Sequence, residues 1–281
     1  MTFFRFDDID RDRMTPNLSS AEGPIIEGEY MYFCNVFKAT GTGSEMHYHP
    51  NELLIFPLSG KINAVVGTDR RIVEPGTFIH VPAFARHSMK ATEDGPLSYL
   101  YVKDQTWTVV GVAADEAPPD QAVSVEEINR QFDDGTVEDR KNKDVGLDSE
   151  ESQAIIDGLG NCYYPILESL DDPVCSARRI SRFEGERLTF EFADLTPGYT
   201  IDEYVSGHEK FIYILNGRME TTIDGETRTI GAGDIVQIKK GATAKMVTGN
   251  DAPVRYAAVE SLPFLEAKVD KMRAERAGDG A

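Results

Sequence analysis

The sequence predicts an all-β protein made of two tandem antiparallel β-barrels or jelly rolls, with a partly helical acidic linker between them and a C-terminal helix. Two observations carry this prediction. Short apolar or alternating segments of strand length follow one another without intervening helices, and the pattern occurs twice. The chain of 281 residues has room for two domains, and its hydrophobic content of 41% is typical of a core-forming protein.

An internal repeat supports the two-domain organisation. A shift of 157 residues aligns two stretches of the chain over about fifty positions, which indicates two copies of one fold. The shift pairs Glu52 with Glu209, Leu58 with Leu215, Gly60 with Gly217, Gly76 with Gly233, Asp94 with Asp251, Pro96 with Pro253, Tyr99 with Tyr256 and Val102 with Val259.

The predicted strands of each copy are bounded by Gly, Pro, Asp and Asn, the residues that interrupt strands and form turns. In the first copy they cover residues 29–39, 44–49, 52–60, 61–66, 70–74, 76–82, 85–91 and 97–104. In the second copy they cover residues 187–195, 211–217, 219–224, 227–238, 244–249 and 254–261.

The remaining segments complete the predicted domain organisation. Residues 105–175 form an acidic, Pro-containing linker with helical patterning near 123–132, and we expect it to pack on the surface. Residues 263–281 follow as a helix that frays toward its Gly-rich tail. The first domain is therefore predicted at 1–104 and the second at 176–262.

The composition limits the partners that the protein can have. A net charge of −19 and a pI near 4.6 argue against nucleic acid and against anionic membrane surfaces, both of which attract clustered Lys and Arg. The N-terminus is too charged for a signal peptide, and no apolar run reaches transmembrane length. Cys34, Cys162 and Cys175 show no disulfide-like spacing. We therefore expect a cytoplasmic protein that acts on a small molecule.

Three of the five histidines form a candidate metal site. His47 and His49 flank Tyr48 in a predicted strand, so their side chains point to the same face and suit a pair of neighbouring ligands. His87 follows a loop that begins at Pro82. A lone buried histidine is usually a hydrogen-bonded core residue, but this clustering favours a metal site.

The motifs around these histidines resemble those of a known family. Gly-x-x-x-His-x-His, followed by an acidic residue and a Gly, and then Pro-Gly-x5-Pro-x4-His, are similar to the two signature motifs of the cupin superfamily. With the repeat, the chain resembles a bicupin over residues 30–103 and 178–260. The resemblance implies His47, His49 and His87 as metal ligands, and it implies a homodimer.

Glu52 is a further candidate ligand, but its position departs from the family pattern. The acidic residue of the family lies seven residues before the Gly of the motif, which is Leu53 here. Neighbouring residues of a strand face opposite sides, so Glu52 points away from the site unless a bulge at Asn51 turns it inward. We favour a three-histidine site that Glu52 supports or does not touch.

The second copy lacks the metal ligands. At the shift of 157, the three histidines correspond to Tyr204, Ser206 and Ala244. We therefore expect a structural second domain, in which Glu209 has a turn or surface role.

Three imidazoles predict a divalent metal ion with open positions for an oxygen-chelating substrate. Fe(II) is our first choice, and Mn, Ni, Zn and Cu accept the same ligands. The leading hypothesis is a non-haem Fe(II) dioxygenase that cleaves a small aromatic or enolisable acid with O2. The alternatives are a redox-neutral isomerase or lyase of a keto-sugar or hydroxy acid, and a non-catalytic cupin that binds a small ligand.

His80 and Arg86 are the candidate catalytic residues near this site. Arg86 precedes a predicted ligand and could steer a carboxylate, although a surface position is the commoner one for such a residue. His80 lies in a strand whose inner face could line the pocket, and a half-exposed strand histidine is the simpler interpretation.

Overall fold

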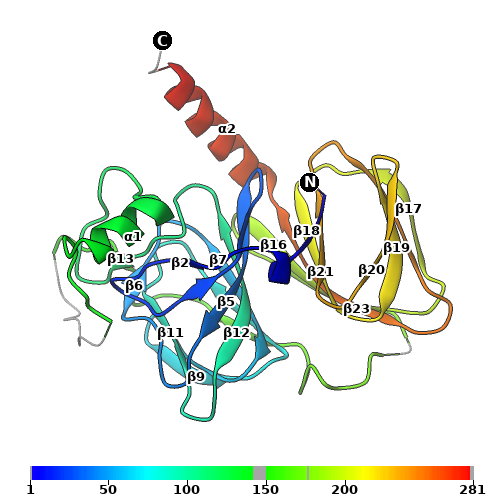
Figure 1. Cartoon of the computed structure of the whole chain (residues 1–281), viewed down its shortest axis with the longest axis horizontal. Coiled ribbons are helices and arrows are strands. Elements are labelled where there is room, and N and C mark those ends of the chain that lie inside the picture. Colours follow the sequence, from blue (N-terminus) through cyan, green and yellow to red (C-terminus); the bar gives the residue numbers. More distant parts are fainter. Residues whose placement is uncertain (1, 142–149, 176, 279–281) are drawn as a thin grey trace. The chain divides into compact units, whose positions relative to one another are not determined.

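The computed structural model describes residues 2–141, 150–175 and 177–278, and it confirms the all-β prediction (Figure 1). The chain divides into two compact units. The N-terminal unit consists of Asp10–Ile26 and Tyr32–Leu170. The C-terminal unit consists of Met1–Ile9, Glu27–Met31 and Asp171–Ala281.

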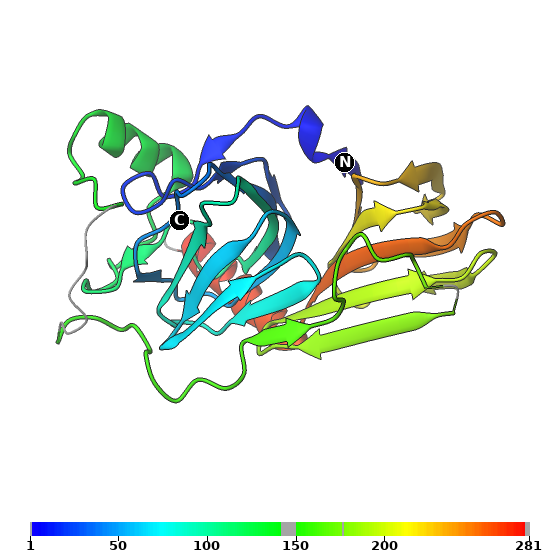
Figure 2. The same ribbon diagram turned by 90° about the horizontal axis from the view of Figure 1, so that it is seen from below.

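Two antiparallel sheets form the N-terminal unit, and its blue and cyan strands curve around a common interior (Figure 2). The larger sheet contains β14 (Tyr163–Pro165), β10 (Thr77–Val81), β7 (Leu53–Ser59), β12 (Leu97–Asp104), β5 (Met31–Lys38), β3 (Glu22–Gly23) and β2 (Asp12–Arg13), in that spatial order, and β4 (Ile25–Glu27) pairs with β5. The smaller sheet contains β13 (Val112–Ala113), β6 (His47–Tyr48), β11 (His87–Ala91), β8 (Ile62–Val66) and β9 (Asp69–Val73).

The C-terminal unit also consists of two antiparallel sheets. The larger sheet contains β1 (Phe3–Arg5), β21 (Asp234–Ile238), β18 (Lys210–Asn216), β23 (Val254–Ser261), β16 (Leu188–Leu195) and β15 (Arg179–Glu184). The smaller sheet contains β17 (Thr200–Val205), β22 (Thr243–Thr248), β19 (Arg218–Ile223) and β20 (Glu226–Gly231). A 3-10 turn, η1 (Phe6–Asp8), follows β1.

The strands reproduce the repeat found in the sequence. A shift of 157 residues carries β5, β7, β10 and β12 onto β16, β18, β21 and β23 with identical bounds. In each unit the inward side chains of the paired strands form an apolar core. Because successive side chains of a strand alternate between its faces, each strand gives the core every second residue.

Short segments outside the repeat extend these sheets. Residues 1–9, assigned by sequence to the N-terminal domain, contribute β1, which pairs Phe3 with Val236 in the C-terminal unit. The predicted linker supplies β13 and β14 to the N-terminal unit. Cys162 and Tyr163 are buried in the core of that unit, so this part of the linker belongs to the folded sheet structure.

Two helices lie where the sequence predicts helical patterning. Helix α1 (Val125–Asp133) begins after Ser124, whose hydroxyl accepts a hydrogen bond from the Glu127 N–H at 3.0 Å. Helix α2 (Pro263–Gly278) begins at a proline, which the first turn of a helix tolerates. Linker residues 142–149 and the tail residues 279–281, where fraying was expected, lie outside the described residues.

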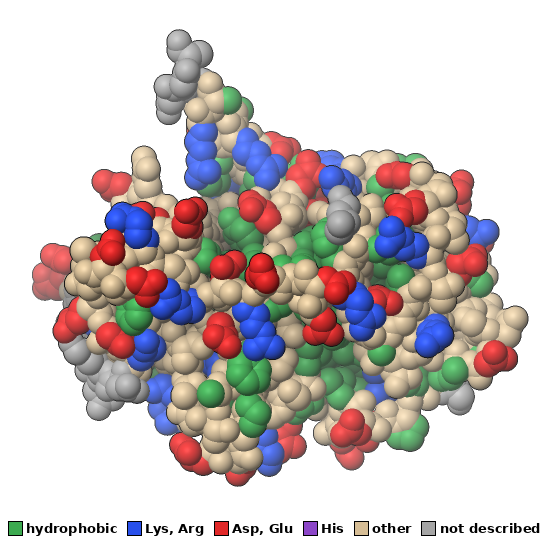
Figure 3. All heavy atoms as spheres, in the orientation of Figure 1, with side chains coloured by type: hydrophobic (Ala, Val, Ile, Leu, Met, Phe, Trp, Pro, Cys, Tyr) green, Lys and Arg blue, Asp and Glu red, His purple; other side chains and the backbone are tan. Residues whose placement is uncertain are grey.

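The charged surface, the helices and the cysteines bear on the possible partners of the protein. Acidic side chains are interspersed with Lys and Arg over the face shown in Figure 3, and the basic residues there do not gather in one patch. Within the described ranges, neither helix has the length and apolar character needed to span a membrane. Cys34, Cys162 and Cys175 are all free thiols.

Candidate metal centre

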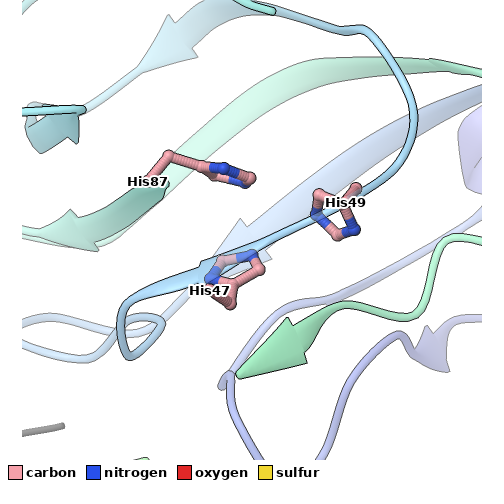
Figure 4. Close-up of side chains that lie close together, drawn as sticks. All are labelled: His47, His49 and His87. Carbon is pink, nitrogen blue, oxygen red and sulfur yellow. The ribbon is translucent and has the colours of Figure 1, made fainter. Parts of the chain in front are cut away.

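Three histidine side chains meet inside the N-terminal unit. One ring nitrogen from each of His47, His49 and His87 lies within 4.8 Å of the others, and all three residues are buried. The ring centroids are 4.3 to 5.0 Å apart. Figure 4 shows the three rings pointing toward one another. The structure therefore brings together all three histidines that the sequence identified as candidate ligands.

Strand pairing places these side chains. His47 in β6 is directly opposite His87 in β11, so their side chains share one face of the sheet. His49 lies two residues after His47 and returns to the same face. The pair formed by His47 and His87 is thus fixed by the backbone hydrogen bonds of the smaller sheet.

Backbone carbonyls select the tautomer of two of these imidazoles. The Nδ1–H of His47 donates to the Glu45 carbonyl at 2.7 Å, and the Nδ1–H of His87 donates to the Ala85 carbonyl at 2.8 Å. A neutral imidazole that donates through Nδ1 keeps a lone pair on Nε2. Such a contact also fixes the ring orientation, which is how proteins commonly hold metal-binding histidines.

His49 has a different partner. Its Nδ1 lies 2.7 Å from Lys103 Nζ and 3.4 Å from the Val110 carbonyl. Burial lowers the pKa of Lys103 well below its usual value, and its Nζ also donates to the Thr108 carbonyl at 2.7 Å. His49 Nε2 is buried without a hydrogen-bond partner among the described residues. A buried nitrogen without a partner costs free energy, and a metal ion at this place would remove that cost.

The electrostatics of the cluster suit a metal ion. Burial lowers the pKa of His47 and His49 well below the usual value, and it lowers the pKa of His87 to about 4. All three imidazoles are therefore neutral near pH 7, which is the form that binds a divalent metal ion. The donor set fits such an ion.

Glu52 lies outside this cluster. Its carboxylate is 1% exposed and accepts a hydrogen bond from His80 Nε2, which lies 2.6 Å from Oε1. The next residue, Leu53, lines the cavity beside the histidines. Neighbouring residues of an extended chain point to opposite sides. Leu53 therefore faces the three imidazoles, and Glu52 points away from them.

Asp104 stabilises the turn at Asn51 and Glu52, which precedes β7. Its Oδ2 accepts the Glu52 N–H at 2.8 Å, and its Oδ1 accepts the Asn51 amide at 3.0 Å. The Asn51 amide also donates to the Asp104 carbonyl at 2.7 Å. These bonds fix the path of the chain from His49 into β7.

His80 and Arg86, the candidate catalytic residues, are not among the residues that line the cavity. The His80 side chain is 20% exposed and contacts Glu52. Arg86 is buried, not at the surface, and its Nη2 donates to the Gly67 carbonyl at 2.9 Å. The placement of these two residues gives their predicted catalytic roles no support.

The cavity contains polar residues that the sequence analysis missed. Lys38, Tyr99 and Tyr101 line it together with the histidines. Lys38 lies on the same face of β5 as the core residues Cys34 and Val36, four and two residues earlier. Alternation within the predicted strands was the signal that could have identified these inward residues.

Gly111 packs against the imidazoles. A Cβ atom at this position would lie 2.6 Å from His47 Cδ2 and 3.2 Å from His49 Cε1. We therefore expect Gly111→Ala to displace these rings and to lower the metal content of the purified protein by about tenfold or more, the scale of changes that disturb ligand orientation. Elemental analysis of the dialysed protein measures this.

The matched control for this substitution is Gly95→Ala. A Cβ atom at position 95 has no neighbour within 4 Å, and the glycine belongs to the same unit. The Gly95 variant should bind as much metal as the wild type. Equal metal content in both variants would contradict the close packing of Gly111 against the candidate ligands.

The C-terminal unit has no equivalent cluster among its described residues. Tyr204 and Ala244 pack in or against its apolar core instead. Glu209 is buried, so a surface role is wrong, and its carboxylate accepts the N–H groups of Glu29 at 2.6 Å and Tyr30 at 2.7 Å. Glu209 thus ties residues 27–31 to the C-terminal unit.

Comparisons with known proteins agree with this architecture. The family model described as a cupin domain matches residues 37–103 and 192–260. No curated protein matches the sequence significantly. Oxalate decarboxylase from Bacillus subtilis, a protein with Mn(II) centres, has a similar structure with a TM-score of 0.61, 16% identity and coverage of 92% of this chain and 77% of that chain.

AerE from Microcystis aeruginosa is also similar, with a TM-score of 0.59, 14% identity and coverage of 90% of this chain and 96% of that chain. At these identities the likeness concerns the fold alone. The two family matches coincide with the two repeats and with the two β-sandwich units. The chain belongs to the cupin superfamily and carries two tandem cupin domains.

Proposed function

We propose that the N-terminal unit is a metal-dependent enzyme centre that acts on a small oxygen-chelating acid. The observation that carries this proposal is the cluster of His47, His49 and His87, whose ring nitrogens lie within 4.8 Å in a buried cavity. These residues would hold the divalent ion through three neutral nitrogens. Such an ion supplies Lewis acidity, or redox chemistry where the metal is iron.

The residues of the chain prepare the site for an anion. Neutral imidazoles leave both positive charges of the ion uncompensated. Leu53, Ile55 and Val109 line the cavity with apolar side chains, which exclude water and strengthen the attraction between the ion and an acid. Lys38 adds to the same lining an amine that can donate hydrogen bonds to an anion.

Our first candidate for the reaction is oxidative cleavage by an Fe(II) dioxygenase. A set of three neutral histidines leaves positions for a bidentate acid and for O2. The homodimer implied by the family resemblance stays a prediction.

A redox-neutral lyase or isomerase is the second candidate. The observation in its favour is the similarity in fold to oxalate decarboxylase, a protein with Mn(II) centres. In this case the acid would lose CO2 or rearrange without net consumption of O2. The binding of a small ligand without turnover remains the non-enzymatic alternative.

Metal analysis combined with gas measurements separates these reactions. The protein is purified without added metal, its metals are measured, and O2 uptake and CO2 release are recorded with small hydroxy, keto and dicarboxylic acids. Iron together with stoichiometric O2 uptake supports the dioxygenase. Manganese with CO2 release and no net O2 uptake supports the lyase, and a protein that binds no divalent metal would refute the proposal.

A further inference from the structure

A buried lysine faces the candidate metal centre. Lys38 is 2% exposed and lies at the end of β5, on the face that carries Cys34 and Val36 into the core. It lines the cavity together with the three histidines. Burial of a lysine costs free energy, because its charged form loses its hydration.

The protein uses only part of the hydrogen-bonding capacity of the Lys38 amine. Lys38 Nζ donates one hydrogen bond, to the Met89 carbonyl at 2.6 Å, and lies 6.0 Å from the centre of the Tyr99 ring. That carbonyl also accepts hydrogen bonds from the Ser44 N–H at 3.2 Å and the Ser44 hydroxyl at 3.3 Å. An ammonium group has three N–H donors, so Lys38 can donate further hydrogen bonds.

Two tyrosine hydroxyls in the lining complete a group of donors. Tyr99 and Tyr101 project from β12, the neighbour of β5 in the larger sheet, and both are buried. Over the described part of the chain, neither hydroxyl makes a hydrogen bond to the protein. A tyrosine hydroxyl that makes no hydrogen bond to the protein can donate to an acceptor supplied by a ligand.

The lining around Lys38 contains basic but no acidic side chains. The lining of the cavity includes three histidines and Lys38 but no Asp or Glu. Burial, together with the nearby charge of Lys90, lowers the pKa of Lys38 to about 7. A carboxylate beside the amine would favour its charged form and raise this pKa.

The second copy offers an internal comparison. At the shift of 157 residues, Lys38 corresponds to Leu195, an apolar core residue of the C-terminal unit. The unit without the histidine cluster therefore also lacks the lysine. The strand does not need a lysine at this position to fold, which favours a role for Lys38 at the histidine site.

We propose that Lys38 and the hydroxyls of Tyr99 and Tyr101 form a carboxylate-binding subsite beside the candidate metal centre. The substrate would then be a small carboxylic acid, with its oxygen atoms shared between the metal ion and these three donors. This inference rests on the proposed function, since the ion must hold the other part of the ligand. The amount of bound metal tests that function separately.

Two probes of nearly equal shape test the subsite. Glycolate carries a carboxylate, whereas glycolamide replaces it with a neutral amide. Their dissociation constants are measured by calorimetry on the Mn(II)-loaded full chain, anaerobically, for the wild type and for Lys38→Met, Tyr99→Phe and Tyr101→Phe. Lys61→Met is the control, because Lys61 is exposed and paired with Glu74 in the same unit.

We expect Lys38→Met to weaken glycolate binding by about 10- to 100-fold, as expected for the loss of a charge-assisted hydrogen bond, and to change glycolamide binding by less than about threefold. Each Tyr→Phe change should weaken glycolate binding by about three- to tenfold. Lys61→Met should leave both constants unchanged.

The remaining outcomes overturn the inference. If glycolate does not bind the Mn(II)-loaded wild type, or if Lys38→Met weakens both probes equally, the subsite does not recognise a carboxylate. If Lys38→Met fails to fold, the two Tyr→Phe variants decide, and unchanged glycolate binding in both refutes the subsite. A wild type that retains no divalent metal ion, whether Mn(II) or Fe(II), would instead refute the proposed function.

Discussion

Replacing His47 with alanine is expected to remove the bound metal and to abolish turnover. His47 lies beside both other imidazoles, with ring-centroid distances of 5.0 Å to His49 and 4.3 Å to His87. Loss of a partner that only orients a ligand costs about 10- to 100-fold in metal affinity, so loss of a ligand should cost at least about 100-fold. Elemental analysis after dialysis, together with titration of the metal-free protein, measures the change.

His80→Ala is the matched control. His80 belongs to the same unit and contacts the Glu52 carboxylate, but it is not part of the three-histidine cluster. Its removal should leave the metal content unchanged. A His47→Ala variant with the metal content of the wild type would refute the site.

Glu52→Gln addresses the remaining question about the ligand set. The glutamine keeps the size of the side chain but removes its charge. If Glu52 lies outside the ligand set, as its contact with His80 indicates, metal affinity should change by less than about tenfold. A loss as large as that in His47→Ala would place Glu52 among the ligands.

The repeated part of the fold was predictable because its signals are local or periodic. Alternating side chains and turn residues identify each strand, and the constant shift of 157 residues identifies the second copy. The histidine cluster was predictable for a related reason. Strand alternation places His47 and His49 on one face, and the family motif supplies His87.

The rest of the structure depends on contacts between distant segments. The pairing of β1 with β21 joins segments more than two hundred residues apart, and nothing in "FFR" specifies that partner. Lys38 and Lys103 were missed for a different reason. A charged residue near the end of a predicted strand is usually exposed, so the charge of each lysine outweighed its place in the alternating pattern. In the structure Lys38 lines the cavity and Lys103 contacts His49.

The two copies share their strands but differ in the polar residues that these strands carry. At the shift of 157, Glu52 and Glu209 are both buried carboxylates with hydrogen-bond partners, although the partners differ. Each therefore has a structural contact, and neither needs a metal ion to satisfy it. What distinguishes the N-terminal unit is the combination of the three histidines with Lys38, which the C-terminal unit replaces mainly with apolar and aromatic residues.

The metal-free protein is expected to lose stability as the pH falls from about 6.5 toward 4. An imidazole in the unfolded chain has a pKa near 6.5, whereas burial lowers the pKa of His87 in the folded protein to about 4. Between these values the unfolded chain binds a proton that the folded protein does not. Acidification in this range therefore favours unfolding, and burial of His47 and His49 acts in the same direction.

The contribution of His87 can be isolated with His87→Gln. Each unit of pKa difference corresponds to about 1.4 kcal/mol, so His87 should account for about 2 to 3 kcal/mol of the loss between pH 7 and 4.5. Urea unfolding of both metal-free proteins at these two pH values measures this quantity. Carboxylates that titrate in the same range affect both proteins alike, so the difference between the two losses belongs to His87. Equal losses would mean that His87 takes up a proton as readily in the folded protein as in the unfolded chain, which contradicts a buried, neutral imidazole held by the Ala85 carbonyl.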